Sequence, residues 1–180
     1  YVYHGGESEK FLGKALKNYP RESYKLATKF NYGANPDYKA VLKEQLEYLQ
    51  TDYIDFYLLH ALDWERFEQT IIPCGLVDKM VEAKKAGKIR YMGFSFHDSL
   101  DSFKKMVDYT DLWDFCQIQY NYINTDYQAG MEGLRLAHEK GLAVVIMEPL
   151  RGGAIANVPE EVANMLPKSP VESALDFLWN

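Results

Sequence analysis

The chain has 180 residues, nearly half of them apolar, and a formal net charge of −6. This length and composition predict a globular protein with a substantial core, whereas the acidic balance excludes the basic stripe that a nucleic acid partner requires. No apolar run approaches the roughly 20 residues of a membrane span, so no membrane partner is expected.

Five short apolar runs, rich in β-branched and aromatic residues, are predicted to be strands. In chain order they are "YKLATKF" (24–30), "YIDFYLLH" (53–60), "KIRYMGFS" (88–95), "DFCQIQYN" (114–121) and "LAVVIME" (142–148). Their composition is typical of parallel strands that are covered on both faces.

The segments between the strands are predicted to be amphipathic helices, because their apolar residues recur at helical spacing. The four stripes are Val41, Leu42, Leu46 and Leu49; Leu76, Met80 and Val81; Leu100, Phe103 and Val107; and Met131, Leu134 and Ala137. Gly87 and Gly141 follow two of these helices, where a left-handed C-cap residue is wanted, and Asp98 or Ser99 would cap the start of another.

Strands and helices alternate about every thirty residues, which predicts parallel strands with right-handed crossovers. No glycine-rich phosphate turn joins a strand to its helix, so a TIM barrel, (α/β)8, is favoured over a doubly wound sheet. A full barrel needs about 250 residues. Residues 1–180 are therefore expected to be one partial barrel domain of about five βα units, with strands missing at both ends. The chain starts at Tyr1, and a helix-opening signature at Ser169, Pro170 and Glu172 comes shortly before Asn180.

Polar side chains stand at or near the ends of all five predicted strands. They are Lys29; His60; Ser95 and His97; Gln117, Gln119 and Asn121; and Glu148. Because the carboxyl ends of parallel barrel strands open on one face, these side chains are expected to converge there. Alone, Lys29 would mark where a strand meets water and His60 would be a structural histidine, but their pairing on adjacent strands favours a functional site.

A lysine beside a tyrosine makes chemical sense, because the cation favours the phenolate and lowers the tyrosine pKa from about 10. Tyr3 is the candidate among fourteen tyrosines. It stands directly before "HGGESEKFLGKAL", a loop and helix that precede the Lys29 strand by half a βα unit.

The ordered motifs along the chain resemble those of the aldo-keto reductases. They are Tyr3 with "GGESEKFLGKAL", Lys29 in "LATKF", His60 in "IDFYLLH", "GKIRYMGFS", "QIQYN" and "MEPLRGG". The resemblance covers residues 1 to 180 in one register. It is nearest to a bacterial and archaeal branch whose members often carry a ferredoxin-like domain after the barrel.

This resemblance implies a nicotinamide-dependent reductase of a small carbonyl substrate, usually with NADPH, while NADH stays open. Tyr3 would be the general acid, Lys29 the cation that tunes it, and His60 the group that orients the carbonyl. Ser95 and Gln117 match positions that hold the nicotinamide carboxamide. The other positions that resemble cofactor-binding residues are Met147 and, in a loop near the phosphates, Pro149, Leu150, Arg151, Gly152 and Gly153.

The chain departs from the family pattern at several points. The Asp that pairs with the lysine belongs five residues before Tyr3, upstream of Tyr1. Phe96 stands where many members have Asn, and Met147 where many have a ring that stacks on nicotinamide. Cys74 and Cys116 are interpreted as packing residues, so no metal site is predicted and a 4Fe–4S cluster would lie outside this segment. Without a disulfide pattern, a reduced, cytoplasmic protein is expected.

Two other functions stay open. Lys29 would suit Schiff-base chemistry, as in barrel aldolases, once its pKa is lowered. Alternatively, the barrel would bind nicotinamide as a sensor or serve as a non-catalytic subunit. By itself the 180-residue segment is expected to have negligible activity, because missing strands leave unpaired edges.

Overall fold

The computed structural model describes residues 1–179, in which five strands form one sheet in the order β1-β2-β3-β4-β5. The strands are β1 (Ala27–Phe30), β2 (Ile54–Leu62), β3 (Ile89–Phe96), β4 (Phe115–Gln119) and β5 (Ala143–Met147). All four neighbouring pairs are parallel. Strand order follows chain order without the reversal of a doubly wound sheet, so the predicted fold class, an incomplete (α/β)8 barrel, is confirmed.

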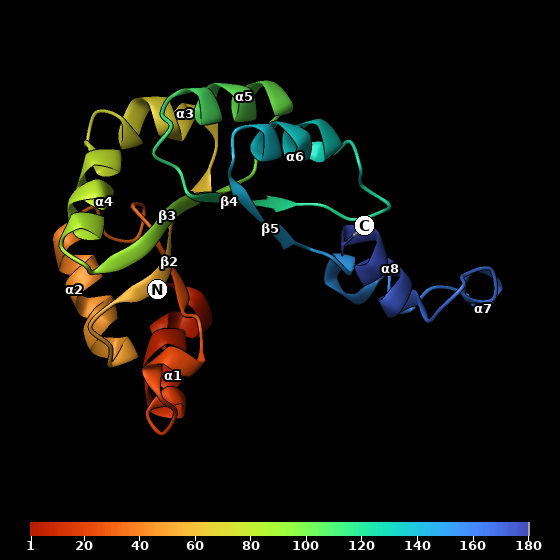
Figure 1. The fold of residues 1–180 in the computed structure, drawn as a ribbon, viewed down its shortest axis with the longest axis horizontal. Coiled ribbons are helices and arrows are strands. Elements are labelled where there is room, and N and C mark those ends of the chain that lie inside the picture. The colour runs from red at the N-terminus through yellow and green to blue at the C-terminus, as the bar shows by residue number, and fades with distance from the viewer. Residues whose placement is uncertain (180) are drawn as a thin grey trace.

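Helices follow the strands and line the outer side of the curved sheet, where α2, α4, α3, α5 and α6 lie one after another (Figure 1). The helices are α1 (Ser8–Leu16), α2 (Tyr38–Leu49), α3 (Trp64–Arg66), α4 (Leu76–Lys85), α5 (Leu100–Asp108), α6 (Gly130–Glu139), α7 (Glu160–Ala163) and α8 (Pro170–Trp179). Shorter turns are η1 (Tyr3–Gly6), η2 (Arg21–Ser23), the π-helical η3 (Phe67–Ile71) and η4 (Arg151–Gly153). Within residues 1–179, no helix combines the length and apolar character needed to cross a bilayer.

The hydrophobic core lies between the outer face of the sheet and these helices. Alternate residues of β2 and β3 point into it, and Tyr57, Leu59 and Phe94 are completely buried there. Val41 of α2 and Phe103 of α5 are buried from the helical side, as their spacing predicted. Each fully buried large apolar side chain contributes about 1.5–3 kcal/mol, so this layer accounts for most of the stabilising burial.

The predicted helix ends are also found. Gly87 and Gly141 take the left-handed conformation, with φ of 69° and 75°. Ser99, rather than Asp98, caps α5, because its Oγ accepts a hydrogen bond from the Ser102 backbone N–H at 3.3 Å. A reciprocal capping box between Ser169 and Glu172 starts α8.

Three boundaries differ from the prediction. β1 begins at Ala27 rather than Tyr24, because η2 turns the chain and the Arg21 side chain donates to the Tyr24 carbonyl. β4 ends at Gln119, so Asn121 lies beyond the strand. β5 is more exposed than its apolar sequence suggested, because it forms an edge of the sheet within the described residues.

An aromatic floor fills the lower part of the inner face of the sheet. It consists of Phe56, Tyr91 and Phe115: Phe56 stacks on Tyr91 with ring centroids 5.2 Å apart and meets Phe115 edge-on at 5.3 Å. Gly93 leaves room for this packing, since a Cβ there would lie 2.4 Å from the Phe115 carbonyl oxygen and 2.8 Å from its ring. The polar residues lie above this floor, toward the carboxyl ends of the strands.

Candidate active site

Inward-facing residues of neighbouring strands bring four of the predicted polar side chains to the same end of the sheet. Lys29, His60, Ser95 and Gln117 belong to β1, β2, β3 and β4, and Ser95 is the register partner of Gln117. A cavity of about 260 Å³ extends from β1 to β4, and it is lined by Lys29 and Gln117 together with Phe56 and Phe115 of the aromatic floor. The predicted convergence at the strand ends is therefore observed for these residues.

A local irregularity at the end of β2 positions His60. The β2–β3 register shifts between Leu59 and Leu62, and Ala61 has a φ of 52°, which is rare for a residue with a Cβ. The Ala61 backbone N–H, freed from the ladder, donates to Ser95 Oγ at 2.8 Å. Such bulges commonly redirect a side chain beside an active site, and here the neighbouring side chain is His60.

Tyr3 reaches the site from a turn before α1. His4 and Gly5 within η1 have φ of 53° and 65°, and this tight turn presents the phenol to the mouth of the sheet. The Tyr3 hydroxyl lies 3.0 Å from His60 Nε2, and the rings are 5.7 Å apart at a tilt. Tyr3 is 47% exposed, so the hydroxyl is open to a ligand as well as to His60.

Lys29 lies under the same ring, with its Nζ 6.0 Å from the Tyr3 centroid. Burial lowers the pKa of this amine from its ordinary value. The structure thus brings together the phenol, amine and imidazole that the sequence analysis singled out.

A buried polar network beneath Lys29 was not predicted. Gln45 Nε2 donates to the Lys29 carbonyl at 3.0 Å and to Glu9 Oε1 at 2.8 Å, and Gln45 Oε1 accepts from the Tyr57 hydroxyl at 2.6 Å. Thr28 Oγ1 also donates to Glu9. The available signal was a Gln at an apolar position of the α2 stripe, between Val41 and Leu49.

Asn31 is a second unpredicted neighbour of the site. Its Nδ2 lies 2.9 Å from His60 Nδ1, so both imidazole nitrogens have partners. Burial, followed by the positive charge of Lys29, lowers the pKa of His60 to about 4. His60 is therefore neutral near pH 7. Asn31 follows Lys29 by two residues, and that same-face spacing of an extended chain was the signal available in the sequence.

Ser95 and Gln117 offer complementary hydrogen-bonding groups. The buried Ser95 Oγ accepts from the Ala61 N–H, and its hydroxyl hydrogen has no acceptor among residues 1–179. Gln117 Oε1 is buried and, among residues 1–179, has no hydrogen-bond partner. A free donor beside an orphaned acceptor matches a primary carboxamide, so the two residues fit the amide of a nicotinamide ring.

The other residues predicted to bind a cofactor follow β5. Met147, half-buried, is the register partner of Gln119, and the loop of residues 149–153 leaves the sheet from that end. Asn121 supports the loop by donating to the Glu148 carbonyl at 3.0 Å. Glu148 and Arg151 both have positive φ, 56° and 49°, so the loop is sharply bent. His97 Nδ1 lies 3.5 Å from Gln128 Nε2, just beyond the end of β3.

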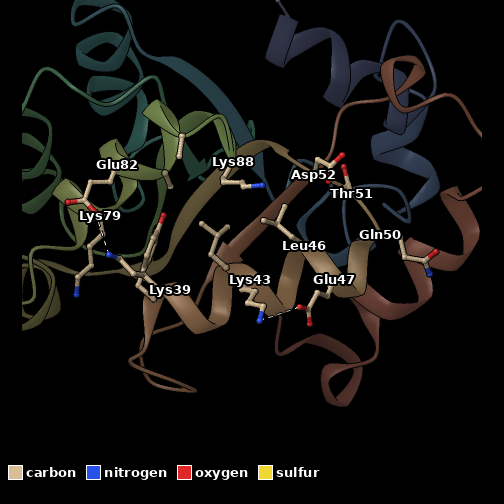
Figure 2. Close-up of a pocket in the computed structure, with 14 residues that line it drawn as sticks. Lys39, Lys43, Leu46, Glu47, Gln50, Thr51, Asp52, Lys79, Glu82 and Lys88 are labelled. Carbon is tan, nitrogen blue, oxygen red and sulfur yellow. Dashed lines mark ion pairs between the residues drawn. The ribbon is translucent and has the colours of Figure 1, made fainter.

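A groove of about 700 Å³ on the outer side of the sheet does not coincide with this site. It lies between α2 and α4 and includes Leu46, and ion pairs at its rim join Lys39 to Glu82 and Lys43 to Glu47, each at 3.8 Å (Figure 2). None of the polar strand-end residues lines it.

The family model and the similar proteins point to the same family. Residues 1–179 match the aldo/keto reductase family. The chain is 31% identical to a probable aldo-keto reductase 1 from Glycine max, over 88% of this chain and 48% of that protein. It is 30% identical to the NADH-specific methylglyoxal reductase of Escherichia coli K12, over 85% of this chain and 51% of that protein.

A solved structure, the holo form of aldo-keto reductase AKR11C1 from Bacillus halodurans, superimposes with a TM-score of 0.77 at 26% identity, covering 98% of this chain and 65% of that one. The chain spans about half the length of the curated relatives it matches.

Proposed function

Because the chain belongs to the aldo/keto reductase family, we propose that it carries the catalytic centre of an oxidoreductase that reduces a small carbonyl compound with a nicotinamide cofactor. The observation that carries the proposal is the meeting of Tyr3 Oη and His60 Nε2 at 3.0 Å above the Lys29 amine. We also propose that residues 1–180 form part of one barrel domain.

Tyr3 would act as the general acid. Its hydroxyl would donate a proton to the carbonyl oxygen as negative charge builds there, and Lys29 would stabilise the phenolate that remains. His60 would donate a hydrogen bond from Nε2 to the same oxygen and fix its position. A carbonyl oxygen placed between Tyr3 Oη and His60 Nε2 would accept from both groups.

Ser95 and Gln117 would hold the carboxamide of the nicotinamide ring, through the free Ser95 hydroxyl hydrogen and the orphaned Gln117 Oε1. The cofactor, when bound, supplies the hydride that reduces the carbonyl carbon. Met147 would lie near the ring, and the backbone and side chains of residues 149–153 would approach the phosphates. NADPH is the expected cofactor, with NADH as the alternative that the name of the Escherichia coli relative suggests.

The test is an activity assay on the intact protein. Methylglyoxal and aromatic aldehydes, with NADPH or NADH, should cause loss of cofactor absorbance at a rate that depends on enzyme concentration. Tyr3→Phe should lower kcat/KM by about 10²–10⁴-fold, the usual contribution of a general acid, while cofactor binding by fluorescence stays within twofold. Tyr19→Phe, an exposed tyrosine after α1, is the matched control. Unchanged reduction by Tyr3→Phe would refute the mechanism, and cofactor binding without any turnover would favour a non-catalytic subunit.

One observation favours a second candidate function. Burial lowers the Lys29 pKa, and a more readily neutral amine suits attack on a carbonyl to form a Schiff base. Borohydride trapping with a carbonyl substrate discriminates between the two, because only the imine mechanism leaves a reduced adduct on Lys29.

A further inference from the structure

The direction of the Asn31 side-chain amide can be read from its own contacts. The Ala34 backbone N–H donates to Asn31 Oδ1 at 3.1 Å. A backbone N–H is always a donor, so the oxygen end of the amide faces Ala34. The nitrogen end therefore faces His60 Nδ1, 2.9 Å away.

This orientation specifies which imidazole nitrogen carries the proton. The Asn31 NH2 group is a donor only, so His60 Nδ1 must be the acceptor and cannot carry a proton. In the neutral ring the single hydrogen then lies on Nε2. Nε2 is the nitrogen that faces Tyr3 Oη, and so the imidazole N–H points to the place of the reacting oxygen.

We propose that Asn31 is a positioning residue that holds His60 in the neutral Nε2–H form, which makes His60 a fixed hydrogen-bond donor to the substrate oxygen. This inference rests on the proposed carbonyl reduction for its catalytic consequence, but the protonation pattern itself is a property of the protein alone. The Asn31 amide contacts His60 Nδ1 and the Ala34 N–H, and its proposed effect on the reaction is exerted through His60.

The charges around His60 support the same form. Lys29 of β1 and Arg66 of α3 are positive groups whose charges disfavour the imidazolium, and His97 beyond β3 acts in the same direction. Tyr3 of η1 also faces His60, with its hydroxyl 3.0 Å from Nε2. A neutral Nε2–H donor suits the mechanism, because it donates a hydrogen bond to the oxygen and leaves Tyr3 as the proton source.

The decisive variant is Asn31→Asp, which keeps the shape and keeps an oxygen for the Ala34 N–H. A carboxylate accepts only, so it would pair with a proton on His60 Nδ1. The ring would become either the Nδ1–H form, which presents a lone pair to the substrate, or an imidazolium whose titration midpoint moves up toward about 6.5 or above.

The first measurement needs no activity. In protein labelled with ¹⁵N-histidine, long-range ¹H–¹⁵N spectra distinguish the two neutral forms and follow titration. Unmodified protein should show His60 as Nε2–H from pH 5 to 8. In Asn31→Asp, His60 should take the Nδ1–H form, or its titration midpoint should rise by more than one pH unit. Asn35→Asp adds the same charge in the same loop, where Asn35 Oδ1 accepts from the Asp37 N–H, and should change neither.

The second measurement links the form to rate. At pH 8, Asn31→Asp should lower kcat/KM for carbonyl reduction by about 10²-fold, the loss typical of one donor withdrawn from a developing oxyanion. The deficit should shrink as the pH falls through the raised His60 midpoint, because the imidazolium again carries a proton on Nε2. A purely structural role for Asn31 would lower the rate equally at all pH values.

An Nδ1–H ring in the unmodified protein would overturn the proposal, and that result needs no variant to fold. An unchanged His60 spectrum in Asn31→Asp would also overturn it. Failure of the proposed function is distinguishable, because the spectra would then follow the prediction while no carbonyl compound was reduced by any variant.

Discussion

The Cα atoms of Ser95 and Gln117 are partners across the β3–β4 ladder, so both side chains point to the same side of the sheet at the same height. Among the residues that the structure describes, the Ser95 hydroxyl hydrogen has no acceptor and Gln117 Oε1 has no donor, so an unused donor lies beside an unused acceptor. Two complementary unsatisfied groups side by side support the proposal that Ser95 and Gln117 hold a ligand amide.

Gln117→Leu should separate binding from stability. NADPH affinity should fall about 5- to 20-fold, because one to two hydrogen bonds of about 1 kcal/mol are lost. The free energy of unfolding without cofactor should stay equal or rise, because the substitution removes a buried oxygen that lacks a partner. Fluorescence titration and urea unfolding check the two effects. The control is Gln69→Leu, on an exposed part of η3, which should leave both NADPH affinity and the free energy of unfolding nearly unchanged. An equal loss of NADPH affinity in the two variants would contradict the proposed role of Gln117.

Lys29→Met should make the protein more stable and less active. Burial lowers the folded-state pKa of Lys29 below 10.5, so between the two pKa values the unfolded chain binds more protons and stability rises with pH. Below that window the buried charge carries its full cost, which Met removes. The urea midpoint of Lys29→Met at pH 7 should therefore be higher than that of the parent, and its increase between pH 7 and 10.5 should be smaller. The kcat/KM for carbonyl reduction should fall about 10²–10³-fold.

The control for Lys29→Met is Lys25→Met, because Lys25 lies before β1 and is 63% exposed. It should leave both the midpoint and the rate nearly unchanged. A destabilised Lys29→Met variant would mean that the amine is stabilising in the folded state, which contradicts the lowered pKa.

His60 should contribute to acid destabilisation. Its folded-state pKa is about 4 and its ordinary value is 6.5, so between these values the unfolded chain binds the extra proton. Stability should fall as pH drops from 6.5 toward 4, with no further contribution below both values. His60→Gln should show a flatter pH dependence in urea unfolding at pH 7, 5.5 and 4.5. His138→Gln, on an exposed face of α6, should keep the original slope.

Gly93→Ala should destabilise the sheet below the site. The added Cβ would lie 2.4 Å from the Phe115 carbonyl oxygen, which is backbone and cannot turn aside. Overpacking of this kind costs about 1–3 kcal/mol, so the urea midpoint should fall measurably. Gly33→Ala is the control, because its Cβ would meet only the Asn31 side chain at 3.4 Å. A Gly93→Ala protein as stable as the parent would show that β4 can shift away from β3.

Much of the fold and of the candidate site was predictable from the sequence, since both depend on short periodic patterns. The alternation of strand and helix specified the parallel sheet, and a Lys and a His at the ends of neighbouring strands specified a shared mouth. The bulge at Ala61 was not predictable, because no residue type there demands a positive φ. Asn31 and Gln45 were missed for another reason: their roles depend on which partner faces them in space.

The aromatic floor of Phe56, Tyr91 and Phe115 sets a limit on molecular recognition by this barrel. It covers the inner face of β2, β3 and β4 below the polar residues, so a molecule bound at those residues would extend outward, toward the loops that follow the strands. Changes in substrate size or shape should therefore be sought by engineering those loops. Replacing the aromatic floor with smaller residues would destabilise the sheet without enlarging the range of compounds bound.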